Sequence, residues 1–174
     1  MRDRWVLVAR LALVLVLVVA LQTVVASRVS ILGVTADLFL ILVVLVGMMR
    51  GSVAGALFGF CAGLVADIVF LEPIGLRAVI YLTAGYMAGR YLEAAGPPGA
   101  WAVMLLTALV SLLSQTAYGI FQFVVGPQAA FFTMLRVQIL PAALLDGLLS
   151  VPVFFAVTRL RLLRGREVSD PSFR

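Results

Sequence analysis

The chain has 174 residues, of which 64% are hydrophobic and only 12% are charged. Soluble domains carry about 25% charged residues, so this chain cannot cover a globular surface with polar groups, and the composition excludes a soluble domain. The mean hydropathy of +1.18 agrees with that conclusion. Once turns and tails are set aside, the length suffices for about five or six helical crossings of a hydrocarbon core about 30 Å thick. We therefore predict an all-α, polytopic membrane protein.

Six apolar stretches follow one another along the chain, separated by charged, proline or glycine residues. Arg50-Gly51 is predicted as a tight turn, Glu72-Pro73 ends one span, and the Gly-Pro-Pro-Gly sequence at 96–99 forms a loop. The first stretch follows three arginines and also fits a signal peptide, but because further spans follow we interpret it as a helix. The predicted spans are Trp5–Ala26, Asp37–Met49, Ser52–Leu71, Ile74–Leu92, Ala100–Val125 and one within Phe131–Thr158, where Pro141 and Pro152 predict a kink or a short interfacial segment.

All 13 basic residues are arginines, and most lie at the ends of apolar runs. We interpret them as membrane-orientation charge and not as a nucleic-acid surface. With both termini cytoplasmic, six spans place ten arginines inside and only Arg28, Arg77 and Arg136 outside, which is a strong positive-inside bias. Residues 1–158 then form one six-helix transmembrane domain, and residues 159–174 form a basic cytoplasmic tail.

Cofactor and metal chemistry find no support in the sequence. The chain has no histidine and one cysteine, so an intrachain disulfide and a His/Cys metal site are excluded. That cysteine, Cys61, lies in an apolar run and is predicted to be a small packing residue. No catalytic constellation and no phosphate-binding loop is present, and we expect no enzyme and no cofactor.

Glycine recurs at every fourth position along the third span. Such spacing keeps small residues on one helix face, where they let another backbone approach closely. We favour packing of the third helix against its own neighbours, and the alternative is a face for a partner helix or for a homodimer. The residues of this set are Gly51, Gly55, Gly59 and Gly63, continued by Asp67 with Arg77 as its expected partner, and Gly85 and Gly89 on the fourth span.

Several polar side chains lie within predicted spans, where they are expected to face the protein interior. Asp37 starts a helix, where the macrodipole favours a carboxylate. Asp146 lies near the middle of the sixth span and is expected to hydrogen-bond with a polar stripe on the fifth. We interpret the stripe as interhelical bonding, with a small polar cavity as the alternative. Its members are Thr107, Ser111, Ser114, Gln115, Tyr118 and Gln122.

The third and fourth spans carry a resemblance to a known family. Their residues are Gly51-Ser-Val-Ala-Gly55, then Gly59 to Phe70 with Asp67, then Ile74-Gly75-Leu-Arg to Tyr81, and Gly85-Tyr-Met-Ala-Gly89-Arg90. This pattern resembles the core of MreD, the family of bacterial rod shape-determining membrane proteins. The length, the six spans and the basic tail also fit, whereas Ala36 stands where some members have proline.

The resemblance implies a non-enzymatic scaffold of the cell-elongation machinery in the bacterial inner membrane. Its expected partner is the bitopic protein MreC, whose outer domain engages the elongation-specific penicillin-binding protein and RodA, with MreB on the cytoplasmic side. The resemblance also implies a fold similar to the six-helix substrate-binding subunits of energy-coupling-factor vitamin transporters. A vitamin or small-solute subunit is therefore the alternative function. We favour the scaffold because the first span has no alanines four residues apart and the predicted outer loops are short.

Overall fold

All secondary-structure elements in the described part of the chain are helices. The structure is a computed structural model that describes residues 16, 18–20, 22, 35–71, 73–125 and 138–159. Within them no strand occurs, and residues 16, 18–20 and 22 are helical and lie inside the first predicted span. The five bounded helices are α2 (Leu38–Arg50), α3 (Ser52–Phe70), α4 (Leu76–Ala95), α5 (Ala100–Val125) and α7 (Leu140–Arg159). The predicted all-α class is confirmed for this part of the chain.

Three of these helices are long and apolar enough to cross a membrane. They are α3, the part of α5 from Ala100 to Phe121, and α7. Helix α4 has 20 residues but carries charges at Arg77, Arg90 and Glu93. Helix α2 is apolar but has only 13 residues. Helices that could span a membrane are thus present, while the six-span topology and the cytoplasmic termini remain predictions.

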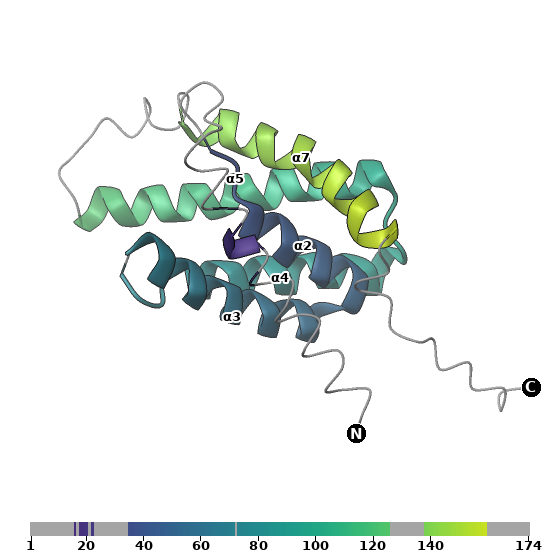
Figure 1. The fold of residues 1–174 in the computed structure, drawn as a ribbon, viewed down its shortest axis with the longest axis horizontal. Helices are drawn as coiled ribbons and strands as arrows, with labels where there is room; N and C mark the ends of the chain where they lie inside the picture. The colour runs from purple at the N-terminus through teal and green to yellow at the C-terminus, as the bar shows by residue number, and fades with distance from the viewer. Residues whose placement is uncertain are drawn as a thin grey trace, which may run out of the picture.

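Helix α2 is the centre of the bundle. Every residue from Leu38 to Met48 is buried, and a helix that is apolar all round belongs in a core. Figure 1 shows α2 between α3 and α4 on one side and α5 and α7 on the other. Its 13 residues extend about 20 Å, which is less than the hydrocarbon thickness of about 30 Å. Helix α2 is thus too short to cross that thickness, and Asp37 and Leu40 at its start line the pocket described below.

The glycines of α3 and α4 bring the two backbones into direct contact. A Cβ atom at Gly59 would lie 2.1 Å from the carbonyl oxygen of Tyr81, and one at Gly63 would lie 2.4 Å from the Cα of Ala78. The contact is reciprocal, because a Cβ at Gly85 would lie 2.2 Å from the carbonyl oxygen of Gly55. The structure thus shows the internal packing that we favoured for this spacing.

Of two further glycines of the set, Gly89 agrees with that conclusion and Gly51 has a different role. Gly89 packs on α3, where a Cβ would lie 2.3 Å from the Cα of Ser52, whereas Gly51 has a φ of +91° and forms the turn between α2 and α3. The glycines between the helices are covered by the same chain, so they do not offer a face to a partner or to a second copy. Cys61 also differs from expectation, because it is exposed on α3 and does not pack in the core.

Candidate functional site

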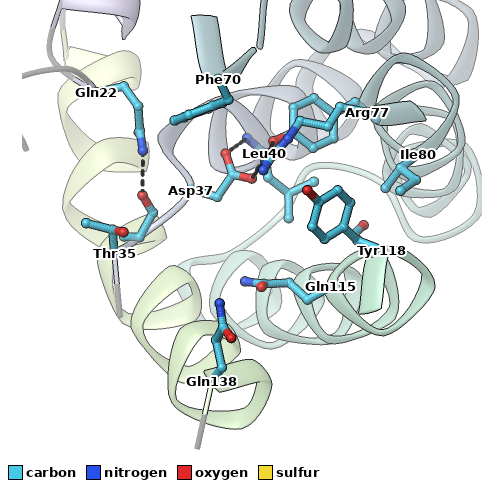
Figure 2. Close-up of a pocket in the computed structure, with 13 residues that line it drawn as sticks. Gln22, Thr35, Asp37, Leu40, Phe70, Arg77, Ile80, Gln115, Tyr118 and Gln138 are labelled. Atoms are coloured by element: carbon cyan, nitrogen blue, oxygen red, sulfur yellow. Dashed lines mark hydrogen bonds and ion pairs between the residues drawn. The ribbon is translucent and has the colours of Figure 1, made fainter. Parts of the chain in front are cut away.

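A polar pocket of about 200 Å³ opens at the end of the bundle where α2 begins. The first residues of α2 and α4, the end of α3, the middle of α5 and the residues before α7 all reach it. Figure 2 shows side chains from these elements directed toward one another across the pocket. Its lining consists of Gln22, Thr35, Ala36, Asp37, Leu40, Phe70, Arg77, Ile80, Tyr81, Ser114, Gln115, Tyr118 and Gln138. We call this set the polar pocket.

Asp37 connects α2 to α4 on one side of the polar pocket. Its carboxylate accepts a hydrogen bond from the backbone N–H of Leu40, at 3.1 Å, and so caps α2, as predicted for an acid at a helix start. Its other oxygen lies 3.5 Å from Nη1 of Arg77 and accepts a hydrogen bond from the hydroxyl of Tyr81. One carboxylate therefore satisfies a helix end and fixes two side chains of α4.

The guanidinium of Arg77 lies between two aromatic rings. It is 4.8 Å from the ring centre of Phe70 on α3 and 5.1 Å from that of Tyr118 on α5, within the range of cation–π contacts. Its Nη1 also donates to the hydroxyl of Tyr81, at 3.2 Å. Arg77 thus joins α3, α4 and α5 and faces Asp37 with a fixed orientation (Figure 2).

Asp67 is fully buried at the end of α3 and binds the start of α4. Its two oxygens accept hydrogen bonds from the backbone N–H groups of Gly75, at 2.7 Å, and Arg77, at 3.1 Å. Such donors at a helix start have no partner within the helix, so the carboxylate supplies one. The expected pairing of Asp67 with Arg77 therefore needs correction: it runs through the backbone of Arg77, and the guanidinium pairs with Asp37.

Asp146 of α7 is also fully buried, directly below the start of α2. It accepts hydrogen bonds from the backbone N–H of Asp37, at 2.8 Å, and from the hydroxyl of Ser111 on α5. The predicted contact between Asp146 and the polar stripe of α5 is thus present at Ser111. This carboxylate therefore joins α7 to the start of α2 and to α5, and it lies next to the polar pocket without lining it.

The rest of the polar stripe divides between the two interpretations that the sequence left open. Ser114, Gln115 and Tyr118 line the polar pocket, which corresponds to the cavity alternative, whereas Ser111 forms the interhelical bond. Thr107 is buried between helices, and its hydroxyl has no hydrogen-bond partner within the described part of the chain. The side chain of Gln122 lies outside the described residues.

Sequence reasoning missed Gln22 and Tyr81. The amide of Gln22 donates to the carbonyl of Ala36 and accepts from the N–H of Leu38, both at 3.0 Å, and so fixes the chain entering α2. Gln22 lies inside an apolar predicted span, and a polar residue in that position is a signal for an internal hydrogen-bonding role. Tyr81 lies four residues after Arg77, on the same face of α4, and that spacing was its signal.

The opposite end of the bundle carries a second polar contact that the sequence did not reveal. Glu93 accepts hydrogen bonds from the backbone N–H of Ser52, at 3.0 Å, and from its hydroxyl, at 2.6 Å. It also pairs with Arg90 at 3.0 Å. Glu93 is exposed and lies one residue beyond the predicted span Ile74–Leu92, and the hydrogen bonds from Ser52 lower its pKa. This contact caps α3 from the end of α4.

The side chains that line the polar pocket can form hydrogen bonds, but they do not form a recognisable catalytic arrangement. Within the described residues, no three histidine, cysteine, aspartate or glutamate side chains lie close enough to hold a metal ion. The charges of Asp37 and Arg77 face each other, and the other polar lining groups are amides and hydroxyls, which lie beside aromatic and aliphatic side chains. Such an arrangement suits binding and positioning of a polar group.

Comparison with known families matches residues 3–163 to the family described as rod shape-determining protein MreD. Comparisons with curated proteins and with solved structures gave no match. The similarity to transporter subunits therefore remains a prediction. The family match includes all six predicted spans and every residue of the polar pocket. The chain accordingly belongs to the MreD family, whose members are rod shape-determining membrane proteins.

Proposed function

We propose that this protein is a non-enzymatic scaffold of the cell-elongation machinery and that it binds the transmembrane helix of MreC in the bacterial inner membrane. The observation that carries the proposal is the family match over residues 3–163, because the family implies a role in rod shape determination. Through MreC, the protein would help to organise lateral peptidoglycan synthesis by RodA and the elongation-specific penicillin-binding protein. MreB filaments on the cytoplasmic side would be a further, indirect partner.

The glycines between α3 and α4 cannot form the docking surface, since α3 and α4 cover each other there. We place the docking surface on the outer face of α3, defined here as Val53, Leu57, Phe60, Cys61 and Ile68, which are all exposed. Val53, Leu57 and Ile68 are 70%, 65% and 64% exposed, and the positions recur at helical spacing. Cys61 is a small residue among large ones and allows close approach of a second helix.

The rigidity of the α3–α4 pair supports this choice. A bitopic partner contributes one helix, so stable association requires a preformed surface on the larger protein. Helix α3 is held by direct backbone contact with α4 and by Asp67 at one end and Glu93 at the other. With both termini cytoplasmic, the polar pocket and Asp67 face outward, toward the side where the soluble domain of MreC begins.

The native Cys61 makes the proposal directly testable. We would coexpress the protein with MreC variants that carry single cysteines along the transmembrane helix and oxidise the membranes with copper phenanthroline. We expect MreC to co-purify in mild detergent and to form a disulfide with Cys61 at one helical register. In the control, Cys61→Ala is combined with Leu148→Cys, which places a cysteine on the exposed side of α7, where we expect no adduct. Absence of MreC from the purified material would contradict the scaffold function, and adducts at position 148 instead of 61 would contradict the docking face.

A solute-binding subunit of an energy-coupling-factor transporter is the second candidate, and the polar pocket is the observation that favours it. Membranes that express both MreC and an energy-coupling module separate the two functions. We expect the protein to recover MreC and to support no uptake of vitamins into vesicles. Recovery of the coupling module, or ligand-dependent uptake, would reverse this assignment.

A further inference from the structure

The charged groups at the polar pocket already satisfy one another. Asp37 and Arg77 lie 3.5 Å apart, with side chains 16% and 19% exposed, and the hydroxyl of Tyr81 binds both of them. Asp146 and Asp67 are fully buried behind the pocket, where Asp67 accepts two backbone hydrogen bonds and Asp146 accepts from Asp37 and Ser111 and also interacts with the side chain of Gln115. An incoming ligand therefore meets a balanced ion pair on this side, and a ligand with a net charge would have to disturb that pair.

The opposite side of the polar pocket carries neutral hydrogen-bonding groups. Ser114 and Gln115 come from the middle of α5, and Gln138 comes from the residues that precede α7. Figure 2 shows the amides of Gln115 and Gln138 directed toward the pocket. An amide has two donors and an acceptor, and a hydroxyl offers both. The amide of Gln115 also interacts with Asp146, which leaves one of its donors and its carbonyl oxygen for a ligand. Polar side chains at this depth in a membrane protein normally face an internal partner or a wet cavity.

The size of the polar pocket limits what can enter it. Its volume is about 200 Å³, whereas pockets for drug-sized ligands are about 300–1,000 Å³. A single six-membered ring with its substituents fits this volume, but a whole lipid with its acyl chains does not. Hydroxyl groups both donate and accept, so a ring that carries several of them matches the amides and hydroxyls on the neutral side.

We propose that the polar pocket binds an uncharged, polyhydroxylated ring of hexose size, supplied as a free sugar or as the head of a glycolipid whose tails remain in the bilayer. Ser114, Gln115 and Gln138 contact the hydroxyl groups, and the Asp37–Arg77 pair closes the other side. This binding site goes beyond the scaffold function and does not depend on MreC, because the outer face of α3 is separate from the pocket lining.

The experiment uses the full chain in phosphatidylcholine nanodiscs, purified without sugar-headed detergents, which would compete for the site. In one arm, glucose is titrated by calorimetry, and for a ligand of this size we expect a Kd on the order of 1 mM. In the other arm, monoglucosyl diacylglycerol replaces part of the lipid, and we expect a higher melting temperature. A response in the first arm alone assigns the ligand to a free sugar, and a response to the lipid assigns it to a headgroup.

Two pocket variants and one matched control test whether binding occurs at this site. Gln115→Leu and Ser114→Ala each remove hydrogen-bonding groups, and we expect about tenfold weaker binding from either. Thr116→Val on the same helix is the control, because that hydroxyl donates to the carbonyl of Leu112 and does not line the pocket. No response in either arm, or binding that both pocket variants leave unchanged, would overturn the proposal. Tighter binding of inorganic phosphate than of glucose would overturn the uncharged class, and loss of MreC alone would affect only the scaffold function.

Discussion

The carboxylate of Asp67 accepts a hydrogen bond from the backbone N–H of Arg77, 3.1 Å away, and this bond fixes the start of α4 against the end of α3. A second bond, from Gly75 at 2.7 Å, holds the turn between the two helices. Because the backbone of Arg77 is held in this way, its guanidinium is aligned with Asp37 across the polar pocket. Asp67 therefore supports the pocket without lining it.

Replacement of Asp67 should destabilise the protein strongly. Asp67→Ala leaves two backbone donors without their partner in a buried site, and we expect a loss of about 2–3 kcal/mol in unfolding free energy. Asp67→Asn retains one acceptor and should lose less. Thermal melting in detergent measures both variants, with Thr83→Val as the control, since that exposed hydroxyl bonds only to the carbonyls of Val79 and Ile80 on its own helix. A melting temperature of Asp67→Ala equal to that of the parent would refute the capping role. We also expect this variant to impair rod-shaped growth.

The contact between α3 and α4 should tolerate no side chain at Gly59. A Cβ there would lie 2.1 Å from the carbonyl oxygen of Tyr81, and a helix backbone cannot move away cheaply. We expect Gly59→Ala to cost about 1–3 kcal/mol, and Gly59→Leu to cost more. Gly99→Ala is the matched control, because its Cβ would meet nothing within 4 Å. Equal melting temperatures for Gly59→Ala and Gly99→Ala would show that the two helices do not touch at this position.

Local patterns predicted the helices and the glycine packing, because both depend on spacing within a few turns. The pocket depends on tertiary contacts that no local pattern contains: Asp37 meets Arg77 and Tyr81 across some forty residues of sequence. The expected partner of Arg77 was the acid nearest in the sequence, Asp67, although that acid binds its backbone. Cys61 was misplaced for a different reason. In a membrane protein the lipid-facing surface is as apolar as the core, so an apolar neighbourhood does not distinguish the two.

Tyr81 should contribute to stability through its hydroxyl. Tyr81 is 2% exposed, donates to Asp37 and accepts from Arg77. Tyr81→Phe preserves the ring but removes both bonds, and we expect a loss of about 1–2 kcal/mol. Tyr86→Phe on the same helix is the control, since that side chain is 47% exposed and a change within about 0.5 kcal/mol is expected. Chemical unfolding measures both variants. Equal free energies of unfolding for Tyr81→Phe and Tyr86→Phe would refute the role of the Tyr81 hydroxyl.

The cap formed by Glu93 on Ser52 should make stability depend on pH in the acidic range. Hydrogen bonds from Ser52 hold the pKa of Glu93 below its usual value of about 4.3. The stabilisation is therefore complete above that value and is lost as the pH falls through the lowered pKa of the folded state. We expect Glu93→Gln to melt at a lower temperature than the parent at pH 7, and the difference should shrink below about pH 4. If the melting temperatures of Glu93→Gln and the parent differed by the same amount at pH 7 and below about pH 4, the ionised carboxylate would be excluded as the cause.

The topology predicted from the arginines places the polar pocket on the outside of the cell membrane. Six spans with both termini cytoplasmic put ten arginines inside and three outside, and the opposite orientation would reverse that bias. In a Cys61→Ala background, Ser30→Cys and Gln128→Cys should react with an impermeant maleimide in intact cells. Ala95→Cys, at the last residue of α4, should react only after the membrane is permeabilised. Cys61 is removed so that the introduced cysteine is the single thiol in each variant. Labelling at position 95 in intact cells would overturn the six-span topology and would move the polar pocket to the cytoplasmic side, where a glycolipid headgroup of the outer leaflet could not reach it.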